Sequence, residues 1–411
     1  MMENQSNKNG TQQDDHSISK QSTEQHTQST NDPIYKILIV IGGLLGFGTL
    51  AGIFLPAIIL AIGMGLTDNP NRFKFELPYN AIDFQKIAYI DNQFVMYGID
   101  YNSDSCEHDL VIFNSKNGES WTKSKIAGVN PENESEAHSY YDISREGTFI
   151  YYNNHCFLIG ATSYILSSTD CNHWQYIKPH MANKSAVPLW GARGSAIANS
   201  TLYVAANFSG IYSTTDGYSW KKEELPVIEE SGINKYQNIF NSIAAGDNKI
   251  VALKEWNHDN KQEGVIYTKN LATNKWSYDV YPVAVRNITR GKDRFVAMTE
   301  STALVLIDKS QYWNSYDLPA GGDRLTFGLN DLFIDISGMS YLERSYDGET
   351  WNVIEPKERP KKFILDAACS KMICIGAGTN YYTIYTFDGI TYYQGKFNHE
   401  NQRLHWWKRF F

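Results

Sequence analysis

The chain is short of cysteine and of positive charge, and each shortage excludes a class of protein. Five cysteines in 411 residues are too few to make a disulfide framework. Lys and Arg number 37 against 45 Asp and Glu, which gives a net charge of −8 at pH 7. An acidic chain lacks the basic stripe that a phosphate backbone requires, so we expect no nucleic-acid partner.

The sequence also lacks the motifs of common catalytic and cofactor sites. It contains no glycine-rich phosphate loop, no nucleophile elbow and no pair of histidines at metal-ligand spacing. We therefore expect no cofactor, no metal ion and no catalytic residue of these types.

Two of the cysteines stand close together. Cys369 and Cys374 flank a predicted tight hairpin. They either pair across it in an oxidising compartment or remain free buried thiols.

Two further absences divide the N-terminal part of the chain. Residues 1–33 contain no aromatic residue and no apolar cluster, which predicts a disordered polar tail. Residues 37–67 contain no charge, and sixteen of the 26 positions from Ile37 to Ile62 are Ile, Leu, Val or Phe. Such a stretch predicts one transmembrane helix within residues 34–66, because core helices seldom stay apolar on all faces over this length.

The orientation of this helix is poorly specified, because Lys20 and Lys36 on one flank are matched by Arg72 and Lys74 on the other. We favour a cytoplasmic tail, with the domain formed by residues 67–411 on the non-cytoplasmic side of the membrane.

The third region is built from seven repeats of about 40 to 50 residues. A full repeat has two short apolar runs, a Ser/Thr-x-Asp-Gly motif and an aromatic anchor three positions later, and the motif is worn down in the copies around Trp276 and Trp313. The anchors are Trp121, Trp174, Trp220, Trp276, Trp313, Trp351 and Tyr392, spaced by 53, 46, 56, 37, 38 and 41 residues. Five copies are nearly complete, with Asn117, Asp170, Asp216, Asp347 and Asp388 at the Asp position. The period is typical of four-stranded propeller blades.

Every part of the motif has a role in folding. Gly supplies left-handed backbone angles to a turn between two strands, and Asp accepts hydrogen bonds from the amides of the turn. The aromatic residue starts the next strand and can fill the space between sheets. Cys171 replaces Gly in one copy. That turn is therefore either strained or of another type.

The motif resembles the Asp-box (BNR) repeat of sialidase-like propellers, and most closely that of non-catalytic bacterial propellers of the photosystem II stability/assembly factor type. The resemblance covers residues 72 to about 397. The repeats and the resemblance together predict an all-β fold, a seven-bladed β-propeller of four-stranded antiparallel blades. The segment Phe73–Pro78 is expected to form an extra outer strand that closes the ring. The basic, aromatic segment Arg403–Phe411 either packs on the last blade or contacts the membrane interface.

The topology of such blades puts the Asp turns on one rim and the longer loops on the opposite face, where binding sites usually form. Five arginines recur near the expected starts of first strands: Arg145, Arg193, Arg286, Arg290 and Arg324. From this face we select the candidates that combine contact area with directed hydrogen bonds, and they are Trp190, Arg193, Tyr236, Trp256, Arg286 and Arg324.

The sialidase resemblance implies an arginine cluster that includes an Arg-Ile-Pro sequence near the start of the domain. The chain has no Arg from Phe73 to Ser144 and no Arg-Ile-Pro. We therefore expect a membrane-anchored, non-catalytic scaffold that binds a protein or a glycan. The alternatives are a divergent sialidase-like glycan-processing enzyme and a purely structural envelope protein.

Overall fold

The computed structural model describes residues 81–406 with gaps, of which 128–142, 229–237 and 355–363 are the longest. The chain divides into two compact units, Met1–Phe75 and Glu76–Phe411, and all described residues belong to the second. The predicted tail, the predicted membrane helix and the segment Phe73–Pro78 lie outside the described residues. Within the part that is described, no helix is long and apolar enough to cross a bilayer.

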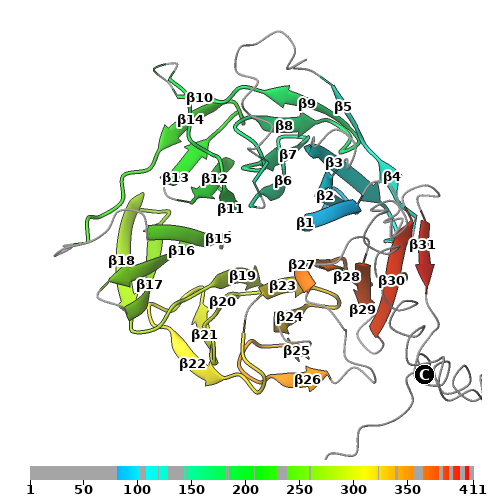
Figure 1. The fold of residues 1–411 in the computed structure, drawn as a ribbon. Helices are drawn as coiled ribbons and strands as arrows, with labels where there is room; N and C mark the ends of the chain where they lie inside the picture. The colour runs from blue at the N-terminus through cyan, green and yellow to red at the C-terminus, as the bar shows by residue number, and fades with distance from the viewer. Residues whose placement is uncertain are drawn as a thin grey trace, which may run out of the picture. The chain divides into compact units, whose positions relative to one another are not determined.

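Every regular element in the described residues is a β-strand, and the strands form seven sheets, which we number as blades in chain order (Figure 1). Blade 1 comprises β1 (Ala81–Ile90), β2 (Gln93–Tyr101), β3 (His108–Ser115) and β4 (Thr122–Lys123). Blade 2 comprises β6 (Thr148–Tyr152), β7 (His155–Ile159), β8 (Ile165–Ser168) and β9 (His173–Ile177), with β5 (Lys125–Ala127) on its outer edge. Blade 3 comprises β11 (Ala192–Ala198), β12 (Thr201–Ala206), β13 (Gly210–Thr214) and β14 (Ser219–Lys222), with β10 (His180–Met181) outside.

The remaining four blades follow in the same order. Blade 4 comprises β15 (Asn238–Ala245), β16 (Lys249–His258), β17 (Lys261–Asn270) and β18 (Lys275–Tyr281). Blade 5 comprises β19 (Asn287–Gly291), β20 (Arg294–Met298), β21 (Thr302–Ile307) and β22 (Asn314–Asp317). Blade 6 comprises β23 (Arg324–Gly328), β24 (Leu332–Ser337), β25 (Tyr341–Ser345) and β26 (Asn352–Ile354). Blade 7 comprises β27 (Ile364–Cys369), β28 (Cys374–Gly378), β29 (Thr383–Phe387), β30 (Tyr392–Asn398) and β31 (Arg403–Trp406).

The first strands of the blades form a closed ring. They contact one another in the order β1, β6, β11, β15, β19, β23 and β27, and β27 returns to β1 (Figure 1). Lys86 on β1 lies 3.3 Å from a carboxylate oxygen of Asp366 on β27, and the amide of Ile87 donates to the other oxygen at 3.0 Å. The described residues therefore form an all-β propeller with antiparallel blades, with one sheet for each repeat.

The prediction of four strands in every blade is wrong for three blades. β5 and β10 run parallel to the outer strands of blades 2 and 3, although each follows the last strand of the preceding blade in sequence. β31, within the basic C-terminal segment, pairs antiparallel with β30 of blade 7. The sequence period counts only the strands inside each repeat, so it cannot detect a strand that crosses to the next blade.

The core lies between neighbouring blades. In β12, Leu202 and Val204 pack towards Phe157 of blade 2, whereas Tyr203 and Ala205 pack towards blade 4. Side chains alternate between the two faces of a strand, and both faces of this strand are buried. This arrangement explains why the second strands appear in the sequence as continuous apolar runs.

In blades 1, 2, 3 and 6 the Ser/Thr-x-Asp-Gly motifs form one recurring turn between the third and fourth strands, which we call the Asp turn. The copy at Asp388 lies outside the described residues. In blade 3, Thr214 Oγ1 accepts the amide of Gly217 at 2.9 Å, and Asp216 Oδ1 accepts the amide of Ser219 at 2.7 Å. The same bonds recur around Asn117 and Asp347. Partial burial works to raise the pKa of Asp216, but hydrogen bonds from Ser219, Tyr218 and Thr214 outweigh it and hold that pKa below its usual value.

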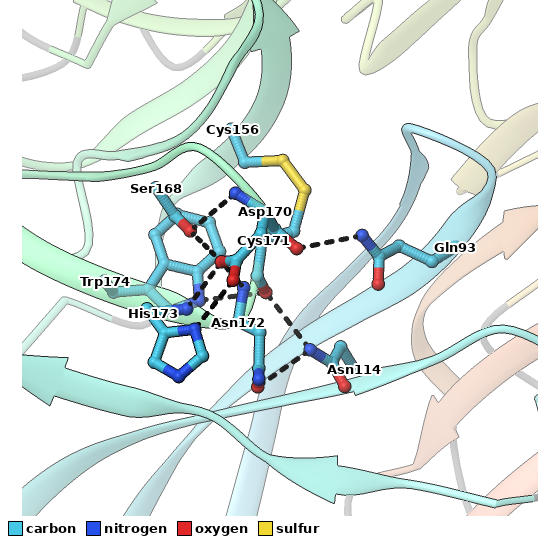
Figure 2. Close-up of a disulfide and its surroundings, with 9 residues drawn as sticks. All are labelled: Gln93, Asn114, Cys156, Ser168, Asp170, Cys171, Asn172, His173 and Trp174. Atoms are coloured by element: carbon cyan, nitrogen blue, oxygen red, sulfur yellow. Dashed lines mark hydrogen bonds and ion pairs between the residues drawn. A yellow bond between two sulfur atoms is a disulfide. The ribbon is translucent and has the colours of Figure 1, made fainter.

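Cys171 keeps the Asp-turn geometry of blade 2 although it is not glycine (Figure 2). Its φ is 55°, in the left-handed region that Gly217 also occupies with φ of 85°. Its sulfur is bonded to Cys156 on β7, with the two Cα atoms 5.3 Å apart. The strained alternative therefore describes this turn, and the disulfide ties it to the second strand.

The anchor tryptophans differ between complete and incomplete repeats. Trp121, Trp174 and Trp220 are 1% exposed and Trp351 is 7% exposed. Trp276 and Trp313, which we expected to be equally buried, are only partly buried. Their repeats lack the Asp turn that positions the other indoles; Trp121, for example, donates its indole N–H to Gly118 O at 2.9 Å.

The Asp turns also bond to the preceding blade. Gln93 of blade 1 donates to Asp170 O at 3.3 Å, and Asn153 of blade 2 donates to Thr215 O at 3.0 Å. Arg294 of blade 5 donates to Asp347 O at 2.9 Å. The turn therefore holds two blades together as well as two strands.

Candidate functional site

The propeller has two faces with different connections. Turns between first and second strands share one face with the Asp turns, and we call this face the turn rim. Loops between second and third strands share the other face with the linkers that start each new blade, and we call it the loop face. Of the five recurrent arginines, Arg290 lies at the turn rim, where its Nη2 is 2.7 Å from Asp308 and 3.1 Å from Asp247.

Arg193 is held at the loop face by partners from two other blades. Its Nε lies 2.6 Å from Glu146 Oε2, in the residues just before β6 of blade 2. Its Nη1 donates to Asn241 Oδ1 at 3.0 Å, on β15 of blade 4. Asn241 in turn donates to Glu255 at 3.4 Å. Because an arginine has five N–H donors in a fixed plane, Nη2 can still donate to an incoming acceptor.

A β-bulge places this arginine. The register between β11 and β12 shifts between Ala192 and Gly194, so Arg193 is the extra residue. Asn241 is the extra residue of a matching bulge in β15, between Phe240 and Ser242. β1 has the same irregularity between Phe84 and Lys86. Bulges turn a side chain out of the regular alternation and often border functional sites.

Two exposed residues extend this region. Trp190 lies in the linker before β11, and it is 46% exposed although it is a large apolar residue. Arg286 lies just before β19 of blade 5, with a side chain that is 40% exposed and 4.0 Å from Glu300. Both side chains are therefore accessible from solvent at the loop face.

The other predicted binding residues are less completely described. Arg324 begins β23 of blade 6, opposite Ile336, and is half-buried. Trp256 lies in β16 between Asn238 and Glu263, but its side chain is not described. Tyr236 lies outside the described residues. Trp190, Arg193, Arg286 and Arg324 thus belong to blades 3, 5 and 6, and Arg193 and Arg286 have separate acidic partners.

Sequence reasoning missed Glu146 and Asn241 as partners of Arg193. Asn241 is placed by a bulge, and bulges have no signal in a single sequence. Glu146 also acts on Tyr97, which donates to Ser144 O at 3.3 Å. Burial, followed by the charges of Glu146 and Asp366, raises the pKa of Tyr97 well above its usual value. This tyrosine stays neutral and serves as a donor between blades 1 and 2.

The described residues contain no group of three or more His, Cys, Asp or Glu arranged to hold a metal ion. The loop face presents the exposed indole of Trp190 and the guanidinium groups of Arg193 and Arg286, of which Arg193 lies in close contact with its acidic partner. This arrangement can bind polar groups with directed hydrogen bonds.

The chain is similar to several solved structures at low sequence identity. The extracellular domain of the one-component system BT4673 from B. thetaiotaomicron matches at TM-score 0.50 with 12% identity, over 75% of this chain and 38% of that one. YCF48 bound to D1 peptide matches at TM-score 0.43 with 15% identity, over 61% and 87%. The Pan2 WD40 domain of Neurospora crassa matches at 0.45 with 9% identity, over 76% and 89%.

The match at TM-score 0.50 supports the propeller fold and nothing finer. No family model matches the chain, and no curated protein matches it.

Proposed function

We propose that this chain is a non-catalytic scaffold that binds a protein partner through the loop face of its propeller. The observation that carries the proposal is the placement of Arg193, whose guanidinium is fixed by Glu146 and Asn241 from two other blades. A donor that is already held in place loses little conformational entropy when a partner binds. Trp190 and Arg286 add exposed contact area of the kind that dominates binding energy.

The alternative of a divergent sialidase-like enzyme is supported less well. Such a mechanism needs arginines that converge on one substrate group. Arg193 and Arg286 lie on blades 3 and 5, and each has its own carboxylate partner. A glycan partner of a binding scaffold stays possible in chemical terms, since aromatic and arginine side chains also bind sugars, but no described contact favours it.

The proposal includes a membrane anchor within residues 34–66 and a propeller on the non-cytoplasmic side. Two disulfides, Cys156–Cys171 and Cys369–Cys374, support the second part, because disulfides persist in oxidising compartments. Alkaline carbonate extraction should leave the chain with the membranes. A reporter that works only in the cytoplasm should be inactive when it is fused to the C-terminus. Activity of this reporter would show that the propeller lies on the cytoplasmic side and would contradict the proposed orientation.

Crosslinking in native membranes with the native chain and two variants tests the binding face. Trp190→Ser combined with Arg286→Ala removes two exposed side chains of the loop face, so we expect at least a tenfold loss of crosslinked partner, the loss of about 1.4 kcal/mol of binding. Tyr312→Ser is the matched control, because Tyr312 is 79% exposed on the turn rim. The same partner, identified by mass spectrometry, should be captured by the control and by the native chain.

The opposite pattern would contradict the proposal: capture lost with Tyr312→Ser and retained by the loop-face variant. Arg193 is unsuitable for this comparison, since its removal breaks contacts among three blades and would lower stability as well as binding.

A further inference from the structure

The outer edges of blades 2 and 3 are covered by strands that the preceding blade supplies. β5 leaves blade 1 and pairs in parallel with β9, and β10 leaves blade 2 and pairs in parallel with β14 (Figure 1). Lys125 N donates to Asn172 O at 2.9 Å, and His180 N donates to Tyr218 O at 3.3 Å. Both acceptors are the carbonyl two residues before the anchor tryptophan, so the two added strands dock in the same way.

Each added strand also places an apolar side chain beside that tryptophan. Ile126 stands opposite Trp174, and Met181 stands opposite Trp220. Both tryptophans are 1% exposed. In each added strand a basic or titratable residue, Lys125 or His180, precedes the apolar one. The outer edges of blades 2 and 3 therefore bind a short extended segment in the same way.

The added strands of blades 2 and 3 come from long linkers, and the linker before blade 6 is much shorter. The linker after β4 covers residues 124–147, and the linker after β9 covers 178–191. The linker before blade 6 covers only 318–323. Six extended residues span at most roughly 20 Å, and crossing from the outer strand of one four-stranded blade to the first strand of the next takes about 14 Å. This linker cannot also run along the outer edge of blade 6.

Blade 6 nevertheless has a complete Asp turn and an anchor, Trp351. Its outer strand β26 has β25 on one side, and no described residue pairs with the other side. Blade 6 therefore has the docking edge that blades 2 and 3 have, without the strand that covers it.

The outward amide on this edge can be identified from other blades. The amide of the third residue after the anchor donates inward, as Ser124 N does to Ile112 O and Glu223 N does to Ile211 O. Because amides alternate between the two sides of a strand, the amide of the second residue after the anchor faces outward. In blade 6 that residue is Val353.

We infer that the outer edge of blade 6 binds an extended segment of a partner protein by strand addition. The segment runs parallel to β26, donates an amide to the carbonyl of Glu349 and places an apolar residue opposite Trp351, with a basic residue before it. We assign the occupant to a separate protein, because the linker before blade 6 is too short to supply a strand as the linkers before blades 2 and 3 do. This edge lies on the outside of the ring, so the interaction is separate from binding at the loop face.

A peptide selection on the full chain tests this inference. Random twelve-residue peptides displayed on phage are selected for binding, and synthetic copies of the selected peptides are titrated against variants. Val353→Pro removes the outward amide without touching the bonds to β25, and proline is tolerated on an edge strand. It should weaken binding at least tenfold, since the lost bond and the steric block together exceed about 1.4 kcal/mol. Val353→Thr, the control, keeps the amide and should bind within twofold of the native chain.

Hydrogen exchange gives a readout that needs no variant. The Val353 amide should exchange quickly in the chain alone and slowly with a selected peptide. Binding should survive Trp190→Ser, which separates this result from the fate of the loop-face proposal. Three results would overturn the inference. The first is that the selected peptides bind a folded Val353→Pro variant as tightly as the native chain. The second is that no selected peptide slows exchange of the Val353 amide, and the third is that this amide already exchanges slowly in the chain alone.

Discussion

A buried ion pair between blades 3 and 4 allows a quantitative test of how the ring is held together. Lys269 on β17 is 3% exposed, and its Nζ lies 2.6 Å from Glu223 Oε2. Glu223 also accepts from Ser213 Oγ at 2.6 Å and from the indole of Trp276 at 3.0 Å. The ammonium lies 4.8 Å from the ring centre of Tyr203. Burial opposes ionisation of Glu223, but the bonds from Lys269, Ser213 and Trp276 outweigh it and lower its pKa.

Removing one member of this pair should destabilise the chain strongly. Glu223→Gln leaves the buried ammonium of Lys269 without a counter-charge. Lys269→Met leaves the buried carboxylate of Glu223 without a counter-charge. Each should lower the free energy of unfolding by about 3 to 5 kcal/mol. The double variant should recover most of that loss, because replacing both charges of a buried pair with neutral groups is often nearly neutral. Urea unfolding followed by tryptophan fluorescence measures all three.

The control is Glu300→Gln, which breaks an exposed ion pair with Arg286. The two side chains are 87% and 40% exposed, so its loss should be about 0 to 1 kcal/mol. If the two single losses simply add in the double variant, or if each is no larger than that of the control, the pair does not join blades 3 and 4 as we describe.

Three further outcomes are expected. Burial raises the pKa of Glu343, which lies opposite the wholly buried Asp335, so the contribution of Glu343 to native stability should be greatest below the ordinary glutamate pKa and should be lost as pH rises above it. Glu343→Gln should therefore lose less stability than the native chain as pH rises from 4 to 8 in unfolding curves. The Cys156–Cys171 disulfide joins residues 15 positions apart, so its reduction should lower the free energy of unfolding by about 3 kcal/mol, measured by thermal unfolding. The Cys369–Cys374 disulfide joins residues 5 positions apart, so its reduction should lower that free energy less. Trp220→Ala should lower the free energy of unfolding by about 3 to 5 kcal/mol, measured by urea unfolding. Trp276 is only half-buried, so Trp276→Ala should lower it clearly less. Equal losses would contradict the difference in burial.

The repeat period and the Asp turns predict much of the fold. Their residues carry local information, because Asp216 and Gly217 bond within four residues of their own position. Strand pairs inside a blade are also local, and the apolar runs locate them. The all-β propeller therefore follows from patterns that a single sequence contains.

The contacts between blades could not be predicted in the same way. β5 pairs with a strand about 50 residues later, through a short segment, Lys-Ile-Ala, that has no strong pattern. Arg193 was a candidate because of its residue type and position, but its partners Glu146 and Asn241 depend on a bulge and on the closeness of first strands. The Cys156–Cys171 bond was missed because one partner stands at a position where the motif demands glycine.

The contact between Lys86 and Asp366 has a consequence for how the chain folds during synthesis. These residues are 280 positions apart, so the bond cannot form until almost the whole chain has been translated. At roughly 5 to 20 residues per second, blade 1 waits about 15 to 60 seconds for its closing partner. Throughout that interval the apolar face of β1 that packs on blade 7 has no cover, and it is a natural contact for a chaperone.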